Sequence, residues 1–143
     1  MKVVNNNDVI EHLALKLKSS INPPDWASYV KTGHGKQRPP IREDWWFVRS
    51  AAVLLSVQKL GPVGVSKLSV KYGTRKNKGV APEKFTRGSR NVIRKILQQL
   101  ESSGLIKQEE VGVHKGRVVT NDAIKLINEA SKEAIKSAKK EAK

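Results

Sequence analysis

A dense group of basic residues occupies the middle of the sequence. Between Lys67 and Lys95 the chain carries ten Lys or Arg residues and a single acid, Glu83. The ten are Lys67, Lys71, Arg75, Lys76, Lys78, Lys84, Arg87, Arg90, Arg94 and Lys95. Gly79 and Pro82 interrupt the segment, so we expect part of it to be a loop. Because cations held so close together repel one another, the segment predicts a polyanionic partner, and a nucleic-acid backbone is the best fit.

A second basic stretch, residues 31–42, shows neither helical nor strand periodicity. Glycine and proline recur in it, which predicts another loop. Its cations are Lys31, Lys36, Arg38 and Arg42. Two basic loops far apart in the sequence suit a folded RNA, which presents phosphates on several sides. We therefore favour RNA over DNA as the partner, and we expect the two loops to grip separate RNA segments.

Arg49 adds a further cation, on the longest apolar helix that the sequence predicts. Two roles are open to it. It can pair with Glu43 or Asp44 at the start of that helix, or it can contact a phosphate. We include Arg49 among the candidate RNA-binding residues.

The three tryptophans are candidates for stacking on unpaired bases. We expect Trp26 and Trp46 to pack in the core instead. One of two adjacent tryptophans must face away from the core, which leaves Trp45 free to stack. Aromatic residues make up only 5% of the chain, too few for a stacking platform.

Nothing in the sequence indicates catalysis. His12, His34 and His114 lie on separate elements without metal-ligand spacing, and the chain has no cysteine. The glycine-containing segments lack the spacing and the Lys-Ser/Thr pair of a nucleotide-phosphate loop. Glu43 and Asp44 are interpreted as helix-start residues. We expect no enzymatic activity, no metal, no cofactor and no small-molecule substrate.

The overall composition is that of one small basic domain. The 143 residues are 38% apolar and carry a formal net charge of +15. No apolar run approaches the roughly 20 residues that span a bilayer, and residues 1–8 are polar rather than signal-like. We expect a single domain over residues 1–143, located in the cytoplasm and without a membrane partner.

The order of predicted elements organises these residues. Helices are expected over residues 8–18, 25–31, 45–59, 65–72 and 89–103, then a hairpin over 105–120, a final helix, and a basic helix end or tail over 131–143. Asp8 with Glu11 predicts a capping box for the first helix, and Asp44 is expected to cap the third. Gly104 predicts a left-handed stop after residue 103.

A pair of helices, a third helix and a two-stranded wing form the layout of a winged-helix domain. We therefore predict a mainly α fold: a winged-helix-like helical core with a short β-hairpin and extra N- and C-terminal helices. Winged helices bind DNA, RNA or proteins, so the layout alone does not give the function. The main alternative is a dimeric DNA-binding transcription regulator that reads base edges with Asn91, Gln98 and Gln99. A third possibility is an adaptor that docks an acidic protein.

Five sequence elements, in order and spacing, resemble a known family. They are Pro24-Asp-Trp-Ala-Ser-Tyr-Val-Lys31, Trp46-Phe-Val-Arg-Ser-Ala-Ala52, Tyr72-Gly73, Phe85-Thr-Arg-Gly-Ser89 and Ile96-Leu-Gln-Gln-Leu-Glu101. The chain resembles, from about residue 8 to 129, the small-subunit ribosomal protein family numbered nineteen in the archaeal and eukaryotic series. The Phe-Thr-Arg-Gly-Ser element is the most specific of the five.

This resemblance implies a ribosomal protein on a mostly helical, winged-helix-like core. It implies residence in the head of the small ribosomal subunit, binding to the 3′ part of the small-subunit rRNA, neighbouring ribosomal proteins as partners, and a role in subunit maturation. The protein would be a monomer within the ribosome. The resemblance implies that the family's positively charged positions correspond in this sequence to Arg49, Arg87, Arg94, Lys95 and the segment 75–78. Val113-His-Lys115 departs from the glycine-rich turn of many eukaryotic members, so the hairpin's contacts do not carry over.

Overall fold

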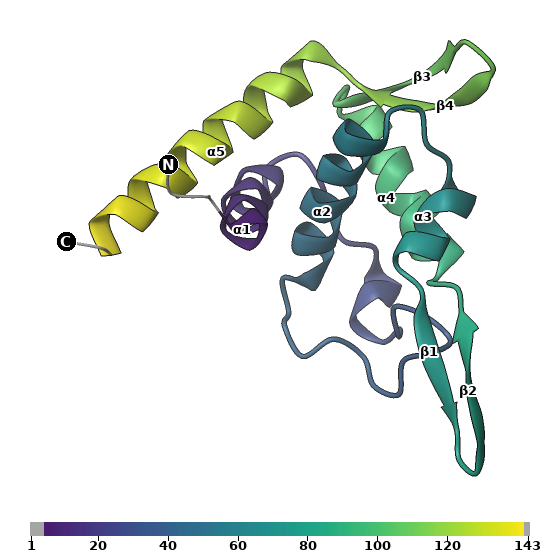
Figure 1. Cartoon of the computed structure of the whole chain (residues 1–143). Coiled ribbons are helices and arrows are strands. Elements are labelled where there is room, and N and C mark those ends of the chain that lie inside the picture. The colour runs from purple at the N-terminus through teal and green to yellow at the C-terminus, as the bar shows by residue number, and fades with distance from the viewer. Residues whose placement is uncertain (1–4, 142–143) are drawn as a thin grey trace.

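A computed structural model describes residues 5–141, with side chains described as far as residue 137 (Figure 1). The elements in chain order are α1 (Asn6–Leu17), a 3₁₀ turn η1 (Asp25–Ser28), α2 (Trp45–Leu60), α3 (Val65–Lys71), β1 (Thr74–Lys78), β2 (Ala81–Thr86), α4 (Arg90–Ser102), β3 (Ile106–Val111), β4 (His114–Val119) and α5 (Asn121–Glu141). The predicted mainly helical fold is confirmed, with two short antiparallel hairpins in place of one.

One cluster of buried side chains joins all of the α-helices. The middle of α2 is apolar around its whole circumference, and Val53 and Leu54 are fully buried there. The helix α4 presents a regular stripe that includes Ile96, Leu97 and Leu100, all at 0% exposure. Burying each such aliphatic side chain is worth about 1.5–3 kcal/mol. The frame is therefore held by apolar packing and does not depend on the charged surface.

The helices α2, α3 and α4 followed by the β3–β4 hairpin have the predicted winged-helix layout. Gly104, with φ of 73°, ends α4, and Leu105 and Ile106 fold back onto the core. Val63, between α2 and α3, pairs with Arg117 of β4 through two backbone hydrogen bonds of 3.2 and 3.0 Å. This bridge fastens the hairpin to the helical frame.

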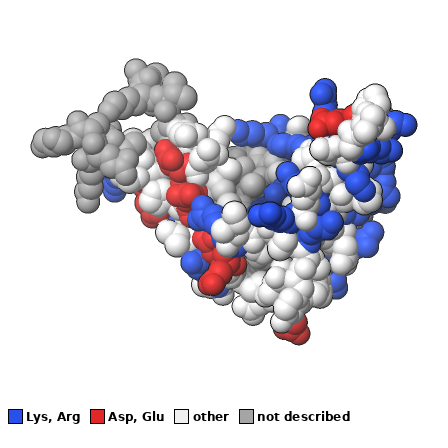
Figure 2. All heavy atoms as spheres, turned by 90° about the horizontal axis from the view of Figure 1, so that it is seen from below, with Lys and Arg blue, Asp and Glu red and all other residues white. Residues whose placement is uncertain are grey.

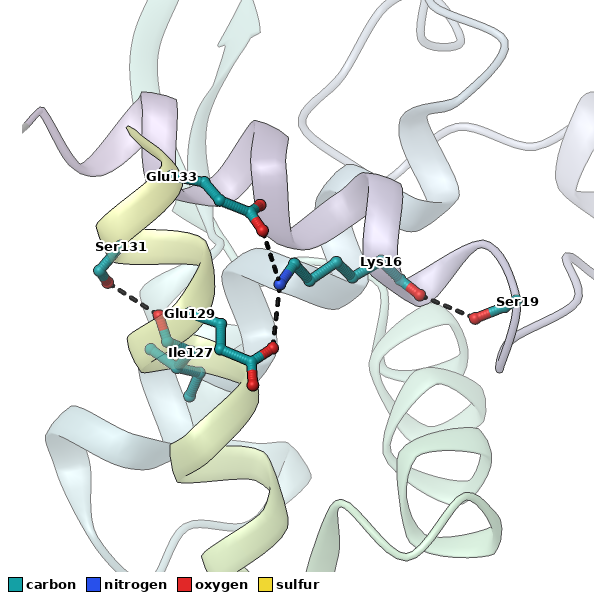
Figure 3. A network of polar contacts seen from close by, with 6 residues as sticks. All are labelled: Lys16, Ser19, Ile127, Glu129, Ser131 and Glu133. Carbon is teal, nitrogen blue, oxygen red and sulfur yellow. Dashed lines mark hydrogen bonds and ion pairs between the residues drawn. The ribbon is translucent and has the colours of Figure 1, made fainter. Parts of the chain in front are cut away.

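The terminal helices pack against each other beside this frame (Figure 1). Lys16 of α1 lies 3.1 Å from a carboxylate oxygen of both Glu129 and Glu133 on α5 (Figure 3). Hydrogen bonds to these two carboxylates raise the pKa of Lys16. Beneath the ion pairs, Leu13 and Ala130 are fully buried, so apolar contact carries the docking.

The structure corrects several predicted helix boundaries. The first helix begins at Asn6, and the side chain of Asn5 accepts a hydrogen bond from the Asn7 amide, so the predicted Asp8 cap is wrong. Asp44 makes no side-chain cap for α2, because Arg42 engages its carboxylate. The proline pair before residue 25 is followed by one 3₁₀ turn, where a longer helix was expected.

The basic loop predicted between α3 and α4 is a β-hairpin instead. The strands β1 and β2 pair from Thr74 opposite Thr86 to Lys78 opposite Ala81, with an irregularity between Lys76 and Lys78. Gly79 has φ of 69° in the turn, and the Asn77 side chain accepts its amide hydrogen bond at 2.7 Å. The hairpin projects from the end of the molecule where α4 begins (Figure 1).

The segment predicted as a basic helix end or tail from residue 131 continues α5 as far as Glu141. Ala134 is fully buried, so at least the first turn of this segment packs against the protein. Within residues 5–141, no helix combines the length and hydropathy needed to cross a bilayer.

The Val63–Arg117 bridge yields a stability prediction. A Cβ added at Gly116 would lie 2.5 Å from the Val63 nitrogen and 2.8 Å from the Pro62 carbonyl carbon. These are backbone atoms, so Gly116→Ala must separate the hairpin from the frame. We expect the free energy of unfolding to fall by about 1–3 kcal/mol, measured by urea denaturation.

Gly64→Ala is the matched control, since an added Cβ there meets nothing within 4 Å and Gly64 has φ of −111°. The control should change the unfolding free energy by less than about 0.5 kcal/mol. Equal stability of the two variants would contradict the role given to the bridge.

Candidate nucleic-acid interface

The β1–β2 hairpin separates its side chains onto two faces. Lys76 pairs with Lys84 and Thr74 with Thr86, so these four side chains share one face. Arg75 pairs with Phe85 on the other face. The cations Arg75, Lys78 and Lys84 are exposed, and the hairpin therefore presents positive charge on both faces.

The loop 31–42 packs against the base of this hairpin. Gly33 and Gly88 form an antiparallel bridge, and the Ser89 amide donates to the Thr32 carbonyl at 3.0 Å. A Cβ at Gly35 would lie 2.5 and 2.6 Å from the hydroxyl oxygens of Thr74 and Thr86. The loop and the hairpin can meet this closely because glycine occupies the points of contact.

The two basic segments, which the sequence placed against separate RNA segments, adjoin each other in the structure. Nζ of Lys76 lies 2.7 Å from Nε2 of His34, which joins the hairpin to the loop through side chains as well. Lys31, Lys36 and Arg38 are exposed around this junction. The two segments form one continuous surface.

The helices α3 and α4 extend the same positive charge. Arg87 precedes α4, and Arg90, Arg94 and Lys95 are exposed on it. On α3, Lys67 and Lys71 are exposed, although the ammonium of Lys71 also donates to the Ser56 hydroxyl at 2.7 Å. Figure 2 shows Lys and Arg gathered in the right-hand half of the view, while most acidic atoms form a band left of centre. We call the set formed by the β1–β2 hairpin, the loop 31–42 and the cations of α3 and α4 the basic surface.

Acidic partners are scarce on the basic surface. Of the fifteen predicted RNA-binding cations, Arg42 is the one that forms an ion pair within residues 5–137. It donates to both carboxylate oxygens of Asp44 at 3.0 Å and to Glu11 at 3.1 Å. These hydrogen bonds raise the pKa of Arg42 and lower that of Asp44. Arg42 is thus the predicted site residue least free to bind a phosphate.

Of the two roles left open for Arg49, an ion pair with Glu43 or Asp44 is not found among the described residues. The guanidinium carbon of Arg49 lies 4.6 Å from the centre of the Tyr72 ring, a cation–π contact. Burial lowers the pKa of Arg49 from its ordinary value and raises that of Tyr72. Among the described residues, no hydrogen-bond acceptor contacts the Arg49 guanidinium.

Arg49 lines a cavity of about 760 Å³ beside the basic surface. The walls come from α1, the loop 32–42, α2 and Tyr72 at the end of α3. Trp45 and Val48 contribute apolar wall, while Lys36 and Arg38 belong both to the cavity and to the basic surface. The cavity therefore opens onto positive charge.

The tryptophans divide largely as predicted. Trp46 is 1% exposed and donates its indole N–H to Gln99 at 3.0 Å. Trp26 is half-buried and packs edge-on against Trp46, with ring centres 5.6 Å apart. Trp45 is half-buried and lines the cavity, as expected for the tryptophan that faces away from the centre.

The wing contributes little to the basic surface. It lies at the opposite end of α4 from the β1–β2 hairpin (Figure 1). Glu109 and Glu110 are exposed on β3, and Lys107 pairs with Glu109 at 3.0 Å. Its turn is Gly112–Val113, so His114 and Lys115, which the sequence placed in the turn, belong to β4.

Phe85 is the residue of this interface that the sequence reasoning missed. Its ring is 55% exposed on the hairpin, and a Cβ at Gly73 would lie 2.4 Å from it. An exposed aromatic ring among cations is suited to stacking on a base. The signal was present in the Asn77–Gly79 turn flanked by threonines and Phe85, which is typical of a hairpin.

Chemistry other than binding finds no support in this geometry. In the described part of the chain, no group of three His, Asp or Glu residues is placed to hold a metal ion. Every buried side-chain nitrogen or oxygen there has a hydrogen-bond partner. The arrangement presents cations, backbone amides and a few aromatic rings, which together suit a phosphate backbone and its bases.

Known proteins are similar to this chain over most of its length. The family model of ribosomal protein S19e matches residues 1–137. The small ribosomal subunit protein eS19 of Aeropyrum pernix is 39% identical over 129 residues, covering 87% of this chain and 82% of its own length. The protein of the same name from Haloarcula marismortui is 40% identical over 130 residues, covering 87% and 83%. That from Myxine glutinosa is 37% identical over 123 residues, covering 85% and 83%. The family resemblance found in the sequence is thereby confirmed, and the chain belongs to the ribosomal protein S19e family.

Proposed function

We propose that this protein is a structural component of the small ribosomal subunit that binds rRNA through the basic surface. The relatives carry the name of small-subunit proteins. One observation supports the RNA contact above all. The cations of the basic surface are continuous, and within the described residues all of them except Arg42 lack an acidic partner. Membership in a ribosomal protein family also confirms the expected lack of enzymatic activity.

The mechanism is electrostatic clamping on a rigid frame. Exposed cations such as Arg75, Lys78 and Arg94 neutralise phosphates, and each neutralised phosphate releases counterions into solution. Such contacts position the protein without reading the base sequence. Specificity then comes from the shape of the folded RNA, to which a projecting hairpin and the adjoining loop must fit together.

Two observations favour RNA over an operator duplex. Gln99, one of the side chains that a DNA reader would use, accepts from Trp46 and donates to the Asn22 carbonyl at 2.6 Å, so it is not free for base edges. The β1–β2 hairpin also projects from the beginning of α4, where a groove-reading helix must approach the duplex (Figure 1). Both observations argue against the alternative of a DNA-binding transcription regulator.

The finer assignment rests on the family resemblance. We propose that the protein resides as a monomer in the head of the subunit in the cytoplasm, bound to the 3′ part of the rRNA beside neighbouring ribosomal proteins. We also propose that it supports subunit maturation. All fifteen cations named from the sequence remain candidate contacts, with Arg42 the weakest because its charge is already paired.

Reversing the charge of the hairpin tests the proposal. Changing Arg75, Lys76 and Lys78 together to Glu should weaken binding to a transcript of the rRNA 3′ domain on the order of 100-fold, because phosphates are then repelled. The hairpin lies outside the buried core, so circular dichroism and the melting temperature should change little. Filter binding at fixed salt measures the affinity.

The matched control changes Lys125, Lys132 and Lys136 of α5 to Glu, which alters the net charge equally on an exposed helix away from the hairpin. The control should retain most of its affinity. Equal losses in the two triple variants would mean that total charge, and not the basic surface, determines binding.

The salt dependence gives a second, independent test. Changing Arg75, Lys76 and Lys78 to Gln removes the charges without introducing repulsion. The slope of log affinity against log salt should then become shallower by about 2, since each lost phosphate contact accounts for roughly 0.7–0.9. Titrations over a series of salt concentrations measure this slope, and an unchanged slope would exclude these three residues from phosphate contact.

A further inference from the structure

The cavity beside the basic surface has the composition of a site for a base and its phosphate. Its volume of about 760 Å³ lies within the range of about 300–1,000 Å³ typical of small-ligand sites. Trp45, Tyr72, Val48 and Ile10 supply aromatic and aliphatic wall. A planar, apolar-faced group fits such walls, whereas an ordinary phosphate contact does not need them.

Two hydrogen-bond donors of the cavity lining have no acceptor among the described residues. Arg49 is half-buried, its guanidinium is stacked on Tyr72, and no described residue accepts a hydrogen bond from it. The indole N–H of Trp45 likewise has no described acceptor, while that of its neighbour Trp46 is bonded to Gln99. Two residues that line the cavity therefore carry donors for which the described residues supply no acceptor.

The entrance of the cavity carries the phosphate-binding groups. Lys36 and Arg38 are exposed at its edge, and both belong to the loop that adjoins the β1–β2 hairpin. An RNA strand lying on the basic surface therefore passes this entrance with its backbone. Arg49, which is half-buried, lines the same cavity and is less exposed than these two cations.

From this continuity we infer that the cavity receives one unstacked nucleotide of the bound RNA, its base against the aromatic wall to which Trp45 and Tyr72 contribute and its edge hydrogen-bonded by Arg49. The inference rests on the proposed function and deepens it by naming where a base is held. It also gives a role to Arg49, which forms no ion pair within the described residues. Glu11, on the cavity wall, is already paired with Arg42 and so does not repel the nucleotide strongly.

Ultraviolet crosslinking of the full-length protein to the rRNA 3′-domain transcript, followed by mass spectrometry of the attached peptides, tests this directly. We expect a nucleotide adduct on Trp45 or Tyr72 in addition to adducts on the hairpin. This arm uses the unaltered protein and so does not depend on any variant's folding.

A variant that fills the cavity provides the second part of the test. Ala52 is half-buried on α2 and lines the cavity, so Ala52→Phe places a ring in the space of the base. Affinity should fall about tenfold or more, a loss typical of one stacked base, while the slope against salt stays unchanged because no phosphate contact is lost. Arg49→Gln should lower the affinity in the same direction, and a melting curve verifies that each variant is folded.

Lys59→Gln is the matched control for Arg49→Gln, since it removes one positive charge from the exposed last turn of α2, away from the cavity. It should leave the affinity within twofold of the unaltered protein. A loss equal to that of Arg49→Gln would overturn the specific role of Arg49.

The outcomes separate the inference from the function on which it rests. Normal affinity of Ala52→Phe with adducts on the hairpin alone would overturn the inference and leave the proposed function standing. If Ala52→Phe binds the transcript normally but no longer enters assembled subunits, the cavity belongs to a protein neighbour, and the inference is again wrong. If the unaltered protein shows no preference for the transcript, the proposed function itself fails.

Discussion

The close backbone approach where loop 31–42 meets the ends of β2 and α3 is the constraint on which the binding surface depends. A Cβ at Gly88 would lie 2.8 Å from the Tyr72 carbonyl oxygen, and the Gly88 amide donates to the Ser69 carbonyl at 2.8 Å. Gly33 bridges to Gly88 from the other side. Without side chains at these points, two segments that are separated by α2 and α3 become neighbours. The cations of the two segments are therefore concentrated on one face. There they repel one another, and together they attract a polyanion more strongly than either segment alone.

The separation of apolar core from charged surface allows this concentration. The acids pair with cations mainly elsewhere: Glu129 and Glu133 hold Lys16 between α1 and α5, and Glu101 holds Arg117 at the wing. Apart from Arg42, the cations of the basic surface form no ion pair within the described residues, so their mutual repulsion raises the free energy of the unbound protein. A frame built on fully buried aliphatic side chains can tolerate that cost because its packing is insensitive to salt and charge. Binding then relieves repulsion as well as gaining contacts.

Much of the fold follows from the sequence because apolar periodicity is strong where packing is strong. The stripe of α4 and the uniformly apolar α2 predict their helices within a few residues, and Gly104 predicts the end of α4. The β1–β2 hairpin escaped because its strands bury almost nothing. Both strands are mostly polar or charged, so their sequences show no alternation of apolar and polar residues. Only the Asn77–Gly79 turn indicates the hairpin. The prediction that Asp44 caps α2 was wrong because a nearby side chain competes for its carboxylate. Arg42, two residues away, donates hydrogen bonds to it.

The candidate site, like the fold, was predictable from the sequence only in part. Which residues carry the charge is a property of composition, and the sequence gives it completely. How those residues combine depends on contacts between distant segments, and no local pattern contains them. Arg49 shows the difference: its sequence neighbours suggested an acid partner, whereas the fold places it over Tyr72 and in a cavity shared with the basic loop. A half-buried guanidinium without a carboxylate gains hydrogen bonds when a ligand supplies acceptors. That gain is the physical reason to interpret the cavity as part of the interface and not as a packing defect behind it.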